Sequence, residues 1–232
     1  MDSDFMIPLM VFSTAIIFVG FAVTLVKRKG GRDRLKAREL AVALGFDYVE
    51  GRDALAAKLG ADGLDAQLAM LDKLPGFLKR LIEAGGSWRI KGQVEGISVL
   101  IYPETRSNNK SSTTYTIVRA LYRGPLAFDL RVAKEGFFTK MGKTLFNLED
   151  IEVGDEAFDS LVRIKSKDTM NARLLVGTDD AKRALFNLLS AYSGAFATSS
   201  YAHWERVGLS FETSEIKAVV AALVPVAKAL GA

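Results

Sequence analysis

The stretch Trp88–Tyr102, WRIKGQVEGISVLIY, decides the fold class. Its first half alternates apolar and polar residues with the period of two that is typical of a β-strand with one buried face. Glu95 and Gly96 have the composition of a tight turn, and Ile97–Tyr102 forms a second, more buried strand that we expect Pro103 to end. The stretch therefore predicts an antiparallel hairpin.

Further strands are predicted on the C-terminal side of this hairpin. Thr113–Tyr122 and Leu126–Val132 are expected to extend it into a four-stranded antiparallel meander. Phe158–Lys165 has the pattern of another strand. Ala195–Ser200 and Glu205–Phe211 have the pattern of a C-terminal hairpin.

Helices are predicted between and after these strands. Asp33 is expected to cap a helix that ends near Leu44, and Asp168 is expected to cap a short helix after the strand at 158–165. Thr213 is expected to cap the last helix, which Pro225 should kink or interrupt. Together these elements predict an α+β fold, in which an antiparallel sheet (a meander plus a C-terminal hairpin) carries packed helices.

The segment Phe5–Val26 contains 22 residues and no charge. An α-helix of this length spans about 33 Å, which is enough for a hydrocarbon core of about 30 Å. A cleaved signal peptide would have basic residues before a shorter apolar run, whereas here Asp2 and Asp4 precede the run. We therefore expect one N-terminal transmembrane helix over residues 5–26, after an extracytoplasmic tail of residues 1–4.

The positive charge of the chain is concentrated directly after this segment. Residues 27–39 contain seven Lys or Arg and two acidic residues, whereas the chain from residue 40 onward contains 24 basic and 23 acidic residues. Basic residues that flank a membrane helix stay on the cytoplasmic side and lie near anionic lipid headgroups. We expect this position for Lys27, Arg28, Lys29, Arg32 and Arg34.

This charge pattern predicts the domain organisation. Residues 27–45 form a basic juxtamembrane segment and helix, and residues 46–232 form a cytoplasmic α+β domain. The protein would then be a single-pass inner-membrane protein with its N-terminus outside, and the lipid bilayer is one of its partners. The domain itself has almost no net charge, so no binding of nucleic acid is expected.

The composition excludes several kinds of active site. The chain has no Cys and one His, His203, so it cannot form a thiolate metal site, a cysteine nucleophile or a site with two imidazoles. His203 lies at the predicted turn of the C-terminal hairpin, where an imidazole is on the surface or packed rather than catalytic. We expect no cofactor and assign no catalytic residue.

The acidic segment 149–159 contains six carboxylates within 11 residues. Crowded carboxylates can bind Mg²⁺ or Ca²⁺, which makes Glu152, Asp155 and Asp159 the candidate metal ligands. The alternative is a solvated loop in which Asp155 and Asp159 make local hydrogen bonds around Gly154.

The run Ile151–Asp159, IEVGDEAFD, is followed by Val162–Ile164 and by a capped helix that contains Ala172–Leu175. This arrangement resembles a bacterial family of membrane-anchored domains of unknown function, in which a Gly-Asp-x-x-Phe-Asp strand precedes a helix of the form x-Ala-Arg-x-Leu-Leu. The resemblance covers about residues 85–230 and implies no catalytic residue. It implies a bacterial origin and a structural motif, with a turn, a local cap and a core anchor formed by Gly154, Asp155, Phe158 and Asp159.

Three functions remain open from the sequence. The first is a membrane-anchored accessory or interaction module, whose cytoplasmic domain binds a protein partner or a second copy of the chain. The second is a metal-dependent hydrolase that uses the acidic segment 149–159. The third is a domain that senses anionic lipid through the basic strip and an amphipathic helix over Leu64–Ile82.

Overall fold

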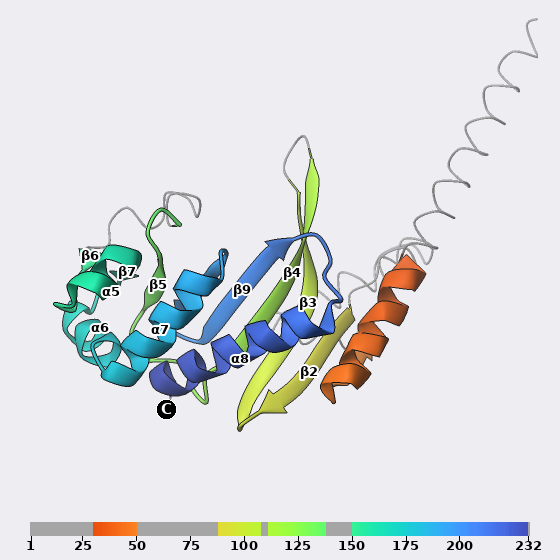
Figure 1. The fold of residues 1–232 in the computed structure, drawn as a ribbon, viewed down its shortest axis with the longest axis horizontal. Helices are drawn as coiled ribbons and strands as arrows, with labels where there is room; N and C mark the ends of the chain where they lie inside the picture. The colour runs from red at the N-terminus through yellow and green to blue at the C-terminus, as the bar shows by residue number, and fades with distance from the viewer. Residues whose placement is uncertain (1–29, 51–87, 108–110, 138–149, 232) are drawn as a thin grey trace, which may run out of the picture. The chain divides into compact units, whose positions relative to one another are not determined.

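The computed structural model describes residues 30–50, 88–107, 111–137 and 150–231 (Figure 1). The chain forms two compact units. The transmembrane helix expected over residues 5–26, the predicted strip residues Lys27, Arg28 and Lys29, and the helix expected over Leu64–Ile82 lie outside the described residues. No helix within the described ranges is long and apolar enough to cross a membrane.

The first unit comprises Met1–Glu39 and Glu50–Trp88. In its described part, a helix begins by residue 30, so Asp33 lies inside the helix instead of capping it. The guanidinium groups of Arg34 and Arg38 each contact the carboxylate of Glu50 at 2.8 Å.

The second unit comprises Leu40–Val49 and Arg89–Ala232 and has an α+β fold, as predicted. Among the residues that the structure describes, its antiparallel sheet contains nine strands in the order β1-β2-β3-β4-β9-β8-β5-β7-β6. The strands are β1 (Asp47–Glu50), β2 (Trp88–Val94), β3 (Ile97–Ser107), β4 (Ser112–Leu121), β5 (Arg131–Lys134), β6 (Asp150–Ile151), β7 (Val162–Lys165), β8 (Ala195–Thr198) and β9 (Tyr201–Val207).

The predicted hairpin of β2 and β3 is present. Its turn consists of Glu95 and Gly96, both with positive φ (52° and 79°), the conformation that two-residue turns between antiparallel strands favour. The prediction that Pro103 ends the strand is wrong, because pairing with β4 continues from Pro103↔Thr116 to Ser107↔Ser112. Proline lacks an N–H but fits a strand where that donor is not needed for pairing.

The prediction of a four-stranded meander is wrong for its last strand. Strands β2, β3 and β4 follow one another, but the next strand in the sheet is β9. Residues 123–130 contain no strand, since Tyr122 and Leu126 donate their N–H groups to the carbonyls of Ser200 and Ser199 in the β8–β9 turn. The strand expected at Leu126–Val132 forms instead at Arg131–Lys134 and pairs with β7 and β8.

The C-terminal hairpin is present with a shifted turn. The hydroxyl of Thr198 accepts hydrogen bonds from the N–H groups of Ser200 and Tyr201, and these contacts close the turn. The second strand therefore begins at Tyr201, four residues before the expected start at Glu205. His203 therefore lies in the middle of β9, where it is 1% exposed, and not at a turn.

Within the described ranges, the second unit also contains the helices α5 (Glu156–Leu161), α6 (Thr169–Val176), α7 (Asp179–Ala191) and α8 (Thr213–Leu230). Asp168 caps α6 as predicted, and Thr178 caps α7. Glu212 takes the cap position of α8, one residue before the predicted Thr213, and α8 continues through Pro225 without interruption. The expected strand at Phe158–Lys165 is wrong in its first half, which forms α5.

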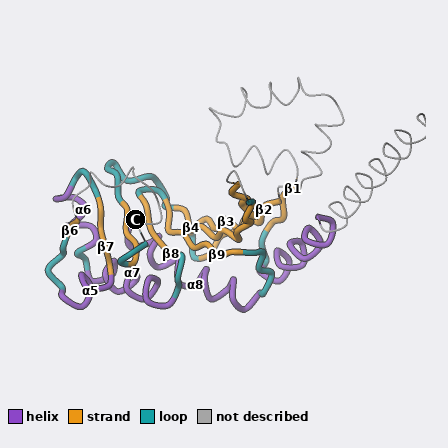
Figure 2. The backbone as a smooth tube through the Cα atoms, turned by 90° about the horizontal axis from the view of Figure 1, so that it is seen from above, coloured by secondary structure: helices purple, strands orange, loops and turns teal. Residues whose placement is uncertain are grey.

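Helices α7 and α8 cover one face of the sheet (Figure 2). Strand residues alternate between faces, and the ion pair of Arg206 on β9 with Glu215 on α8 identifies the covered face. Val118 and Trp204, paired across β4 and β9, lie on it. The apolar side of α8 is buried there, at Ile216, Val219, Val220, Leu223, Val224, Val226, Ala227 and Leu230. We call the opposite face, which carries Arg119 and His203, the polar face.

Candidate functional site

A chain of hydrogen bonds runs across the polar face through five side chains, which we call the polar ladder: Glu104, Arg106, Glu205, His203 and Arg119. Arg106 on β3 donates to Glu104 at 2.8 Å and to both carboxylate oxygens of Glu205 at 3.0 and 2.7 Å. Such a two-pronged contact between a guanidinium and a carboxylate is among the stronger hydrogen-bonded pairs in proteins. The ladder therefore ties β3 to β9 across β4.

His203 occupies the centre of the polar ladder with both ring nitrogens bonded. Its Nδ1 accepts from Nε of Arg119 at 3.1 Å, and its Nε2 lies 3.2 Å from the carboxylate of Glu205. Because a guanidinium can only donate, the proton of the neutral ring is on Nε2. The ring also stacks on Phe196 of β8, with 4.2 Å between the centroids.

The surroundings of the ladder shift the pKa values of its members. Burial lowers the pKa of His203, and the nearby charge of Arg119 acts in the same direction, against the hydrogen bond with Glu205. Burial alone would raise the pKa of Glu205, but hydrogen bonds from His203 and Arg106 outweigh it and lower that pKa to about 2. The ladder thus holds a neutral imidazole beside an ionised carboxylate at neutral pH.

Arg119 sits at the end of the ladder between two tyrosine rings. Its guanidinium carbon lies 4.2 Å from the ring centroid of Tyr201 and 5.5 Å from that of Tyr102. The guanidinium of Arg89 lies 4.9 Å from the same Tyr102 ring. Cations at these distances are attracted to the faces of aromatic rings, so the rings hold the guanidinium of Arg119 in a defined place.

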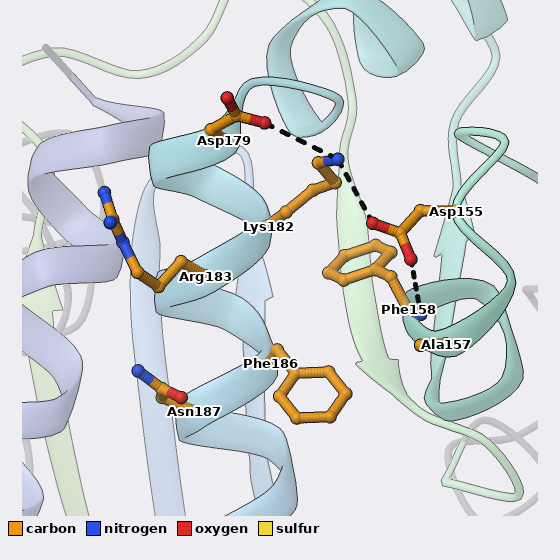
Figure 3. A pocket seen from close by; sticks show the side chains of 8 residues that line it. All are labelled: Asp155, Ala157, Phe158, Asp179, Lys182, Arg183, Phe186 and Asn187. Atoms are coloured by element: carbon orange, nitrogen blue, oxygen red, sulfur yellow. Dashed lines mark hydrogen bonds and ion pairs between the residues drawn. The ribbon is translucent and has the colours of Figure 1, made fainter.

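A second candidate site is a groove between α5 and α7, with a volume of about 480 Å³ (Figure 3). We call it the α5–α7 groove; its lining residues are Asp155, Ala157, Phe158, Asp179, Lys182, Arg183, Phe186 and Asn187. Phe158 is buried, whereas Phe186 extends from α7 beside the groove and is 39% exposed. The groove thus presents an aromatic surface to solvent.

Lys182 joins the two walls of this groove. Its amino group lies 3.2 Å from the carboxylate of Asp155 and 3.6 Å from that of Asp179 (Figure 3). The hydrogen bond with Asp155 raises the pKa of Lys182, and the pKa of Asp155 is lowered by the N–H of Phe158 and by Lys182. The ion pair links the start of α5 to the first turn of α7.

The acidic segment folds around its own backbone. Gly154 has φ of 85°, Asp155 caps α5 by accepting the N–H of Phe158, and Phe158 is 2% exposed. The carboxylate of Asp159 accepts the N–H groups of Val153, Gly154 and Asp155 at 2.9–3.1 Å.

These contacts engage two of the three carboxylates that were predicted as metal ligands, Asp155 and Asp159. Of Glu152, Asp155 and Asp159, the structure brings the last two together in one turn and leaves Glu152 exposed. Within the described ranges, no group of three or more His, Cys, Asp or Glu side chains is placed to hold a metal ion. Of the predicted membrane-surface residues, Arg32 is exposed and Arg34 pairs with Glu50.

Comparison with known proteins adds little to these observations. No family model and no curated protein matches the chain. Among solved structures, the crystal structure of the mycobacterial trehalose monomycolate transport factor A, TtfA, aligns with a TM-score of 0.47 and 12% identity, over 88% of this chain and 95% of that chain. A similarity this weak carries no argument about the function of this chain.

Sequence reasoning missed both the polar ladder and Phe186. The alternation in β4 could have placed Arg119 on one face with Tyr115 and Ile117, but its pairing with His203 depends on the register of β4 and β9, which are more than 80 residues apart. Phe186 lies in α7, on a side of the helix that the groove leaves exposed.

Proposed function

We propose that this protein is a single-pass inner-membrane protein whose cytoplasmic α+β domain is an interaction module, and that a protein partner docks in the α5–α7 groove. The observation that carries the proposal is the exposed ring of Phe186 in a groove with an acidic rim. Exposed apolar surface within a polar rim is typical of sites for protein partners.

The charges at the groove define the chemistry of the partner. Four carboxylates lie in or beside the lining, at Asp155, Glu156, Asp179 and Asp180, against two cations, at Lys182 and Arg183. Both cations are already paired with these carboxylates, and Asp179 and Asp180 remain 97% and 80% exposed. A segment with an apolar side chain flanked by Lys or Arg is therefore complementary to the groove.

The position of the module at the membrane rests on the charge pattern of the sequence. The uncharged segment Phe5–Val26 precedes seven basic residues within 27–39, and this pattern supports a cytoplasmic position for the domain. A partner that docks in the groove would then be a membrane-associated or cytoplasmic protein, or a second copy of the chain.

Purification of the tagged full-length protein from membranes tests the proposal. We expect a partner in stoichiometric amount with the wild type, and its loss with Phe186→Ser, because the substitution removes the exposed ring. Met170→Ser is the matched control, since Met170 is 73% exposed on α6 and does not line the groove.

Charge reversal gives an independent test. Asp179→Lys should weaken capture of the same partner, whereas Glu95→Lys should not, because Glu95 is an exposed carboxylate in the β2–β3 turn. Recovery of a clean monomer from the wild type, or equal capture by Phe186→Ser and Met170→Ser, would contradict the proposal.

A further inference from the structure

One guanidinium of the polar face has an unused hydrogen-bonding edge. Nε of Arg119 donates to His203, but the two Nη groups make no hydrogen bond or ion pair within the described part of the chain. Each Nη carries two N–H donors, so four donors remain. Arg119 is half-buried, and its Nη atoms are not among the buried polar atoms that lack a partner, which indicates that solvent reaches them.

The position of this edge is determined by the sheet. Arg119 lies directly opposite His203 in the pairing of β4 and β9, and Tyr201 and Tyr102 are its diagonal neighbours on β9 and β3. Side chains at such positions are close enough to interact, and the observed ring distances of 4.2 and 5.5 Å agree with this. Three neighbours therefore hold the guanidinium, and a ligand would not have to order it.

The charge around this edge is positive. The positive charge of Arg106, toward the other end of the ladder, is paired with the carboxylates of Glu104 and Glu205. The guanidinium of Arg119 contacts no carboxylate among the described residues, and its contacts are with His203 and the two tyrosine rings. A bound anion would therefore balance the charge of Arg119.

We propose that Arg119 binds a phosphate group through its two Nη atoms, with the rings of Tyr201 and Tyr102 beside it as the walls of the site. The planar guanidinium donates two parallel hydrogen bonds to an oxyanion. The charge of this guanidinium attracts a doubly charged phosphate more strongly than a singly charged carboxylate. This site lies on the polar face and is independent of the α5–α7 groove and of its partner.

Calorimetric titration of the full-length protein in nonionic detergent with inorganic phosphate, at constant ionic strength, tests this site. We expect saturable binding that Arg119→Gln weakens about 10-fold or more, since a charged pair of hydrogen bonds is lost. Arg206→Gln is the matched control, because Arg206 is on the neighbouring strand β9, faces α8 and pairs with Glu215. Acetate should bind more weakly than phosphate.

A second variant shows whether a loss of phosphate binding comes from misfolding. Arg119→Lys keeps the positive charge and loses the two-pronged donor, so we expect phosphate affinity between those of the wild type and Arg119→Gln, with an unchanged thermal midpoint. The absence of saturable phosphate binding by the wild type, or equal affinities for Arg119→Gln and Arg206→Gln, would overturn the proposal.

Vesicles distinguish the two sources of the phosphate group. If a lipid headgroup supplies it, inorganic phosphate should compete with phosphatidic acid vesicles for the wild type but not for Arg119→Gln. If a free phosphate compound supplies it, vesicle binding should be equal for the two proteins while the titration difference remains. Either result supports a phosphate site at Arg119.

Discussion

At the residue scale, the burial of His203 makes the stability of the protein depend on pH. The folded protein keeps the ring neutral because burial lowers its pKa, whereas the unfolded chain takes up a proton near the ordinary value of about 6.5. The charged groups that face it are Arg119 on β4, Glu205 on β9 and Arg106 on β3. The folded state therefore binds fewer protons below pH 6.5, and its stability falls there.

We expect the free energy of unfolding to decrease by up to about 1.4 kcal/mol for each pH unit below this value, until the folded ring also titrates. Thermal midpoints of the full-length protein between pH 8 and pH 5 measure the effect. His203 is the only histidine of the chain, so His203→Gln should remove most of this pH dependence. A wild-type midpoint that does not change over this range would contradict the assignment. Glu205, with its pKa of about 2, adds a further loss only below about pH 4.5.

The residues of the polar ladder also show which contacts cannot be predicted from the sequence. The period of two predicted which stretches form strands, and the α+β class and the β2–β3 hairpin followed from it. The polar ladder could not be predicted, because it requires β4 to pair with β9 in one register. Local patterns determine which face a side chain takes, whereas its neighbour on the next strand depends on pairing between distant segments.

At the element scale, the start of α5 explains why a predicted strand is a helix. The stretch Phe158–Lys165 alternates like a strand, but the cap at Asp155 and the three N–H groups bound by Asp159 stabilise a helical turn over its first residues. A side chain that accepts backbone N–H groups offers the chain an alternative to strand pairing. Alternation alone therefore gave the wrong structure for Phe158–Leu161 and the right one for Val162–Lys165.

Removal of the Asp159 carboxylate, which accepts these N–H groups, should destabilise the turn. Asp159→Ala should lower the free energy of unfolding by about 1.5–3 kcal/mol, because hydrogen bonds to an ionised group are lost and N–H groups lose their partner. Glu152→Ala is the matched control, since Glu152 is an exposed carboxylate of the same segment, and we expect a change within about 0.5 kcal/mol. Thermal unfolding of both full-length variants measures the difference, and equal midpoints would show that Asp159 does not hold the turn.

At the scale of the whole molecule, the proposed function depends on which side of the membrane the α+β domain occupies. The prediction follows from the basic residues between 27 and 39, which should hold the C-terminal side of the segment Phe5–Val26 in the cytoplasm. If the domain were outside, neither a cytoplasmic partner for the α5–α7 groove nor a phosphate compound of the cytoplasm could reach its site.

The absence of Cys from the chain makes this orientation measurable with single introduced thiols. Ser3→Cys lies before the uncharged segment, and Ser193→Cys lies at an exposed position after α7. A membrane-impermeant maleimide applied to intact spheroplasts should label Ser3→Cys and leave Ser193→Cys unlabelled, because the bilayer separates the second thiol from the reagent. After lysis both variants should be labelled, which shows that each thiol is reactive. Labelling of Ser193→Cys in intact spheroplasts would place the domain outside and would contradict the predicted topology together with the cytoplasmic partner.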